Sequence, residues 1–222
     1  MLVGHLAAGL TAKRIAPGVS AGTLVLAAVA ADLLWCGFLI TGIEHVRILP
    51  GHTTQDSLAA IDIRYSHSLL MDAVWGLLFG GTFFARRRCA RGAWVLFALV
   101  LSHWLFDFIS HRPDMPLAPG VPAVFGLSLW DSVPATVAIE GGFWLIALVL
   151  YGRLTHAKGR AGVYGFWCGA ALLTAAWWNN LAGPPPGPNV QALAISSLVF
   201  FSTVTAWAYW MNRARPGIRC PL

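Results

Sequence analysis

Residues 94–114, WVLFALVLSHWLFDFISHRPD, indicate the fold class, because an almost wholly apolar run ends in four hydrophilic side chains. These are His103, Asp107, His111 and Asp114, in the spacing H-x3-D-x3-H-x2-D. At about 100° per residue, the first three fall within an arc of roughly 80° on one face of a helix. Ionisable groups on a helix suited to lipid are costly, so they need a partner, a metal ion or a water-filled cavity. This face is therefore the first candidate for a functional site.

The composition is that of a membrane protein. The chain has 222 residues, of which 57% are hydrophobic and 11% are charged, and its mean hydropathy is +0.66. Soluble domains carry about 25% charged residues. We therefore expect an all-α integral membrane protein with a single polytopic membrane domain over residues 1–222.

Basic residues outnumber acidic ones by 15 to 9, and the pI is near 9.6. In a soluble chain this excess would raise the question of nucleic acid. Here the basic residues cluster between apolar runs, as the positive-inside rule predicts, so we expect membrane lipids and no nucleic acid as partners. The four cysteines stand singly, which indicates neither a zinc ribbon nor a disulfide framework.

Six apolar runs approach the length needed to cross a bilayer. They lie near 20–43, 66–85, 92–111, 133–151, 162–182 and 190–211. The strongly basic connections are Lys13–Arg14, Arg86–Arg91, Arg153–Arg160 and Arg213–Arg219. Six spans would place all of them on one side, which predicts a multi-pass protein of the cell (inner) membrane with both termini in the cytoplasm. Residues 2–12 are too short to span and predict a half-helix beside the bundle.

Polar residues of several predicted spans should lie at similar depth. With a rise of 1.5 Å per residue, His103 lies about 18 Å and Asp107 about 24 Å from the basic side. The same count puts Asp32 at about 18 Å and His67 at about 28 Å, and Glu140 about 12 Å below the opposite surface. A single intramembrane histidine is more often a packing residue than a ligand, but such convergence favours a functional polar site.

Four short patterns occur together in the first half of the chain. They are GHL at 4–6, ADLL at 31–34, YSHSLL at 65–70 and LSHWLFD at 101–107. Their order and spacing resembles the YdjM-like family of predicted membrane-bound metal-dependent hydrolases. The resemblance covers residues 1–115, about half of the chain.

This resemblance implies a metal centre with His5, Asp32, His67, His103 and Asp107 as ligands. Asp32 is the only acid in its element, where the family usually has two. One metal ion is therefore expected rather than two.

The residue types suit a hydrolytic metal site. Histidine and aspartate ligands without cysteine favour Zn²⁺ and tolerate Mn²⁺ or Fe²⁺. His103 and Asp107, four residues apart on a helix, can face one ion, as the histidines of HExxH do. A bound ion lowers the pKa of its water towards about 7 and so makes a nucleophile. The general base must be a group that is not a ligand, and Glu140, Asp114 and His111 qualify.

We therefore predict a membrane-embedded hydrolase that attacks a lipid ester, a lipid phosphoester or a small amide through a metal-bound water. The chain has no GxSxG, Walker or GxGxxG element, which argues against serine-hydrolase and nucleotide chemistry. The alternative is a transporter, or a proton- or metal-conducting protein, that uses the same side chains as a relay. A transporter is expected to show paired broken helices or repeated halves, and the sequence shows neither. A third hypothesis is an assembly factor whose polar groups only tie helices together. Asp72 is either a partner for a polar group or a support for a ligand.

Overall fold

The apolar runs form helices. A computed structural model describes residues 1–48 and 57–217, and it is mostly helical. The α-helices are α1 Leu2–Thr11, α2 Ala21–Ala28, α3 Ala30–Thr41, α4 Leu69–Arg87, α5 Ala90–Ser110, α6 Val133–Thr136, α7 Gly142–Leu154, α8 Gly159–Ala182 and α9 Val190–Ala214. A π-helical turn, Val137–Gly141, joins α6 to α7, and 3-10 turns lie at Ala12–Arg14 and Leu129–Asp131.

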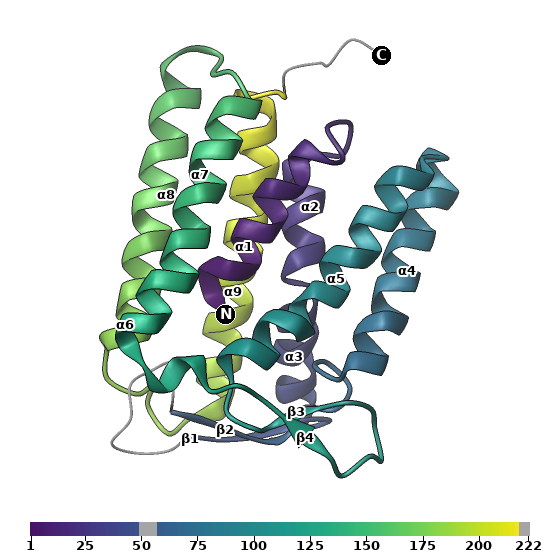
Figure 1. Cartoon of the computed structure of the whole chain (residues 1–222), viewed down its shortest axis with the longest axis vertical. Helices are drawn as coiled ribbons and strands as arrows, with labels where there is room; N and C mark the ends of the chain where they lie inside the picture. The colour runs from purple at the N-terminus through teal and green to yellow at the C-terminus, as the bar shows by residue number, and fades with distance from the viewer. Residues whose placement is uncertain (49–56, 218–222) are drawn as a thin grey trace.

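Two short antiparallel hairpins depart from the all-α prediction. β1, His45–Ile48, pairs with β2, Leu58–Asp62, between α3 and α4. β3, Met115–Pro116, pairs with β4, Val124–Phe125, between α5 and α6. Both hairpins lie at one end of the helices (Figure 1). Strands of two to five residues carry too little alternation to be recognised in a sequence.

Helix α1 lies in the middle of the helices (Figure 1) and is buried along nearly its whole length. It packs chiefly against α7 and α2, and also against α5. A helix that is apolar on all sides belongs in a core, because it has no face for water. At Gly9 an added Cβ would lie 3.0 Å from Cα of Val25, so the backbones of α1 and α2 approach closely. The predicted N-terminal half-helix is present, but it lies inside the helices rather than beside them.

The first predicted span is broken. α2 and α3 meet at Val29 with a bend of 55°, and Val29 has φ −109° and ψ 16°. No glycine or proline marks this position in the sequence. Because of the bend, the carbonyl group of Ala28 at the end of α2 is not covered by α3 and can reach His103 of α5.

Within residues 1–48 and 57–217, four helical segments are long and apolar enough to cross a membrane, and the bent pair α2–α3 could be a fifth. The four are α4, α5, the joined segment Val133–Leu154 and α9. α8, whose second half contains two tryptophans and two asparagines, is not among them. The count of six spans therefore stays a prediction. The α4–α5 and α7–α8 connections, both basic, do lie at the same end of the helices (Figure 1).

Helix α1 runs from the interior to this basic end. Met1 lies at the interior end and is only 6% exposed. Lys13 lies in the 3-10 turn at the other end and is also buried. Lys13 Nζ donates to the carbonyl of Val19 over 2.7 Å and to the side chain of Asn212 over 3.2 Å, and burial lowers the pKa of Lys13. Met1 is buried among the helices, and the cytoplasmic location of both termini stays a prediction. The C-terminal residue, Leu222, lies outside the described residues.

Close packing of α4 on α5 depends on glycines. A Cβ on Gly80 would lie 2.6 Å from the carbonyl oxygen of Ala93, and one on Gly76 would lie 3.0 Å from that of Phe97. Small residues four apart let two helix backbones approach in this way. This contact fixes the start of α4, and the segment before it, against α5.

Candidate metal centre

The five ligands implied by the sequence lie together. His5 comes from α1, Asp32 from α3 and His67 from the turn before α4, while His103 and Asp107 come from α5. The three histidines and Asp107 are buried, and Asp32 is partly exposed. Elements separated by up to about 100 residues thus place their polar side chains in one small volume.

Two groups of three side chains, which share His103, have ligand atoms that all lie within 4.8 Å of one another: Asp32, His67 and His103, and His5, His103 and Asp107. His67 Nε2 lies 3.8 Å from both Asp32 Oδ1 and Asp107 Oδ2. His103 Nε2 lies 3.8 Å from Asp32 Oδ1 and 3.2 Å from Asp107 Oδ2. A tetrahedral ion with bonds of about 2.0–2.2 Å has ligand atoms about 3.3–3.6 Å apart. The four nitrogen–oxygen distances are close to this range, so each histidine nitrogen lies within reach of an ion held by either carboxylate.

His103 is oriented by the break between α2 and α3. Its Nδ1 lies 2.9 Å from the carbonyl oxygen of Ala28, the last residue of α2. A proton on Nδ1 makes this hydrogen bond and leaves Nε2 with a free lone pair. Nε2 is indeed buried without a hydrogen-bond partner among the described residues. Metal-binding histidines usually donate their second ring N–H to a carbonyl or carboxylate in this way.

His67 is oriented by a carboxylate that the sequence analysis missed. His67 Nδ1 lies 2.7 Å from Ser66 Oγ, which donates to Glu44 Oε2 over 2.6 Å. Since the Ser66 hydroxyl gives its proton to Glu44, it accepts from His67 Nδ1, and Nε2 is left free to bind an ion. Glu44 is 1% exposed, and its Oε1 accepts from the backbone N–H groups of Tyr65 and Ser66, each over 2.8 Å. Glu44 stands 22 residues before Ser66, so no local pattern joins them.

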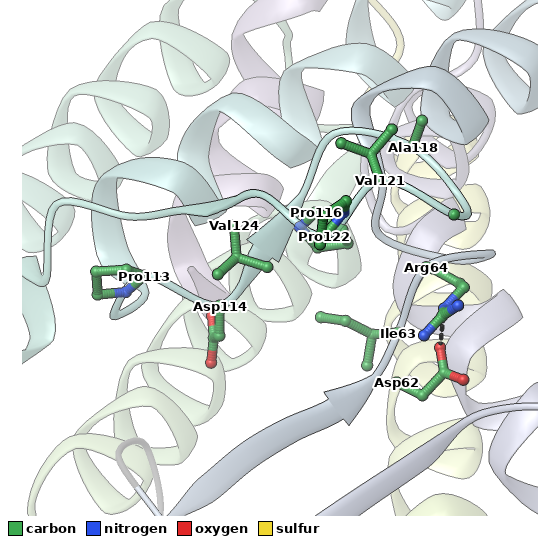
Figure 2. Close-up of a pocket in the computed structure, with 11 residues that line it drawn as sticks. Asp62, Ile63, Arg64, Pro113, Asp114, Pro116, Ala118, Val121, Pro122 and Val124 are labelled. Carbon is green, nitrogen blue, oxygen red and sulfur yellow. Dashed lines mark hydrogen bonds and ion pairs between the residues drawn. The ribbon is translucent and has the colours of Figure 1, made fainter.

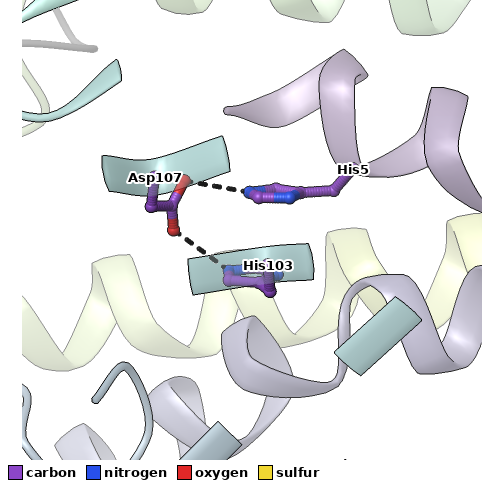
Figure 3. Close-up of side chains that lie close together, drawn as sticks. All are labelled: His5, His103 and Asp107. Atoms are coloured by element: carbon purple, nitrogen blue, oxygen red, sulfur yellow. Dashed lines mark hydrogen bonds and ion pairs between the residues drawn. The ribbon is translucent and has the colours of Figure 1, made fainter. Parts of the chain in front are cut away.

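His5 occupies a different position from the other histidines. Its ring stacks on that of His103, with centroids 3.7 Å apart and planes inclined by 7° (Figure 3). Its Nε2 lies 3.0 Å from Asp107 Oδ1, the oxygen that does not face His103. The amino group of Met1 also donates to Asp107 Oδ1, over 2.6 Å, and lies 3.0 Å from His5 Nε2. Asp107 therefore offers one oxygen to each of the two stacked rings.

Of the three predicted bases, His111 and Asp114 lie at the rim of this cluster. His111 Nδ1 lies 3.2 Å from Asp114 Oδ1, and His111 Nε2 lies 4.0 Å from Asp107 Oδ1. The ring of Trp130 packs against His111 with centroids 4.5 Å apart. Asp114 can thus hold a proton on Nδ1 and leave the nitrogen that faces the cluster free to accept one.

The third predicted base, Glu140, contacts α1 instead. It lies on the π-helical turn, is fully buried, and accepts from the N–H of Gly4 through Oε1 over 3.2 Å. Its Oε2 has no hydrogen-bond partner among the described residues. π-helical turns occur frequently at functional sites. Because Gly4 precedes His5 in α1, this hydrogen bond places Glu140 beside the helix that carries His5 and not beside His111 and Asp114.

Asp72 is also completely buried, near the start of α4. Neither of its carboxylate oxygens has a hydrogen-bond partner among the described residues. It lies close enough to His67 and His103 to interact with them electrostatically. Both roles predicted for Asp72, a partner for a polar group and a support for a ligand, stay predictions.

A cavity of about 420 Å³ opens next to the rim, between the two hairpins (Figure 2). One wall contains Asp62 and Arg64, which form an ion pair over 2.7 Å, and the other contains Asp114. The first wall continues to His67, whose N–H donates to the carbonyl of Ile63. The cavity therefore lies beside residues that contact the cluster, and Asp114 is the one predicted site residue in its lining.

Comparisons with protein-family models, with curated proteins and with solved structures give no match to this chain. The geometry of the cluster therefore carries the functional argument.

Proposed function

We propose that this protein is a membrane-embedded, metal-dependent hydrolase related to the YdjM-like family, with six spans in the cell (inner) membrane. The observation that carries the proposal is that the Nε2 atoms of His67 and His103 each lie 3.2–3.8 Å from an oxygen of Asp32 and an oxygen of Asp107. Two of these atoms belong to histidines whose second nitrogen is already hydrogen-bonded. If these histidines only packed helices together, their Nε2 atoms would have no reason to face the same two carboxylates, Asp32 and Asp107, without a proton.

His67, His103, Asp32 and Asp107 would hold one divalent ion, for which Zn²⁺ fits best and Mn²⁺ or Fe²⁺ are alternatives. Such an ion acts as a Lewis acid and lowers the pKa of coordinated water from 15.7 to about 7. The buried position keeps bulk water away from the ligands, which strengthens the electrostatic attraction between the carboxylates and the ion.

The chain's own residues supply the remaining functions. His111 would accept a proton at Nε2, and Asp114 would fix its Nδ1–H and stabilise the positive ring that results. The cavity between the hairpins would admit a lipid ester, a lipid phosphoester or a small amide to this side of the cluster. Glu140 would hold α1 in place through the N–H of Gly4 rather than act as the base.

The test combines metal content with turnover. Purified wild-type protein should retain tightly bound metal and hydrolyse one of three probes: a lipid phosphoester, a lipid ester or a short peptide amide. His103→Ala should lose both the metal and the activity. His156→Ala, at an exposed position in the α7–α8 connection, is the matched control and should keep both. A metal-free wild type, or an active metal-free His103→Ala, would contradict the proposal.

A second candidate function is a proton or metal relay, favoured by the bent α2–α3 pair and by buried Asp72, whose oxygens accept no hydrogen bond in the described part of the chain. Broken helices line the ion sites of many transporters. Flux through protein reconstituted in liposomes, measured with a pH dye or a metal dye and without hydrolysis of any probe, would favour the relay. Hydrolysis without flux would favour the enzyme.

A further inference from the structure

The ring nitrogens of His5 and His103 and an oxygen of Asp107 lie within 4.8 Å of one another, but the stacking of the two rings argues against one ion shared by both histidines. A metal ion bound to an imidazole lies close to the plane of the ring, about 2.0–2.1 Å from the nitrogen. The two rings are nearly parallel, with planes inclined by 7° and centroids 3.7 Å apart (Figure 3). An ion in the plane of one ring therefore lies outside the plane of the other. The ligands that the resemblance implies therefore form two groups, one around His103 and one around His5.

Asp107 connects the two groups. Its Oδ2 lies 3.2 Å from His103 Nε2, and its Oδ1 lies 3.0 Å from His5 Nε2. A carboxylate that gives one oxygen to each of two ions is a common bridge, and two-metal sites hold their ions about 3.5–4 Å apart. The stacked rings present their Nε2 atoms to different oxygens of Asp107. His5, His103 and Asp107 thus have the arrangement that a carboxylate-bridged pair of ions requires.

The position beside His5 also suits positive charge. The amino group of Met1 lies between His5 Nε2 and Asp107 Oδ1, at 3.0 and 2.6 Å. His111 Nε2 lies 4.0 Å from the same oxygen. A divalent cation at this position would replace a proton of the Met1 ammonium group and bind the neutral amine, or it would push the amino group out of the position.

We propose that the protein has a second divalent-cation site, formed by His5 Nε2 and Asp107 Oδ1 and bridged through Asp107 to the first ion. This inference rests on the proposed metal centre. The second site has two side-chain ligands where the first has four, so it binds its ion more weakly and leaves more positions open. Of the three substrate classes, a phosphoester fits two ions best, because a pair of metals can hold both the attacking and the leaving oxygen.

The test counts ions in full-length protein that has been loaded with Zn²⁺ or Mn²⁺ in detergent. Wild type should bind two ions per chain, with the second at least tenfold weaker in a titration. Mn²⁺-loaded wild type should show the magnetic coupling of two bridged ions in electron paramagnetic resonance. His5→Phe keeps an aromatic ring against His103 and removes the ligand, so it should bind one ion and give an uncoupled spectrum. His156→Ala is the control and should behave as wild type.

The outcomes separate the two proposals. One ion in both wild type and His5→Phe would overturn the second site and leave the first intact. One ion in wild type and none in a folded His5→Phe would also overturn it, because His5 would then serve the first ion. No ion in any form would refute the metal centre itself. Thermal unfolding of the variants checks folding, and His5→Gln provides a second substitution if His5→Phe does not fold.

Discussion

The carboxylate of Glu44 should control how tightly the first ion binds. Glu44→Gln keeps the size of the side chain and one oxygen acceptor for the N–H groups of Tyr65 and Ser66. The amide nitrogen cannot accept from Ser66 Oγ and would donate to it instead. Ser66 would then direct its own proton to His67 Nδ1 and move the ring proton to Nε2. That nitrogen would lose the lone pair that binds the metal.

The size of the effect follows from this chain of hydrogen bonds. Removal of a partner that orients a metal-binding histidine typically lowers metal affinity 10–100-fold. Such a loss corresponds to about 1.4–2.7 kcal/mol of binding free energy. Because Glu44 accepts three hydrogen bonds in a buried position, we expect the upper half of this range.

The assay is a competition between purified protein and a chelator of known affinity, followed by metal analysis. Asp131→Asn removes a carboxylate at an exposed position and is the matched control, with no expected change in affinity. A thermal unfolding curve of the metal-free forms separates loss of the ion from loss of the fold. An unchanged affinity in folded Glu44→Gln would refute the role of the relay from Glu44 through Ser66 to His67.

Three further predictions concern stability, chelation and pH. Gly80→Leu should destabilise the protein by about 1–3 kcal/mol, because its Cβ would lie 2.6 Å from the carbonyl oxygen of Ala93. Gly81→Leu, whose Cβ would meet open space, is the control and should unfold at the temperature of wild type. Equal unfolding temperatures for the two variants would contradict the close packing of α4 on α5. Removal of metal with a chelator should lower the unfolding free energy of wild type by about 2.7 kcal/mol relative to protein held at 100 times Kd, and it should leave His103→Ala unchanged. Metal affinity should fall as the pH falls, because protons compete with the metal for the histidine ligands; an affinity that does not depend on pH would argue against histidine ligands.

Much of the helical framework could be predicted from the sequence. The apolar run before His103 forms α5, and its spacing of four residues places Asp107 on the same face. The short apolar segment 2–12 could be recognised as a helix that needs protein around it. These features were predictable because the period of the helix alone determines them.

Other features depend on contacts between distant segments. The break at Val29 lies in a run of ordinary helix formers, and it brings the carbonyl of Ala28 to His103. Glu44 lies in a connection where a carboxylate is usually solvated, and only the fold brings it to Ser66. The depth of Glu140 in its predicted span made it a candidate base, but in the structure it accepts a hydrogen bond from the backbone of α1.

The number of ions depends on the relative orientation of two rings, which no sequence pattern encodes. The pattern could show that His5 and His103 belong to one cluster. It could not show that their planes are parallel and 3.7 Å apart. The expectation of a single ion, drawn from the lone Asp32, is therefore replaced by the proposal of a bridged pair.

Anomalous scattering from crystals of the zinc-loaded protein, recorded on both sides of the zinc absorption edge, tests the central claim most directly. The account predicts a strong peak about 2.0–2.2 Å from His67 Nε2, His103 Nε2, Asp32 and Asp107. A peak at another place, or no peak in protein that has been shown to bind zinc in solution, would contradict it.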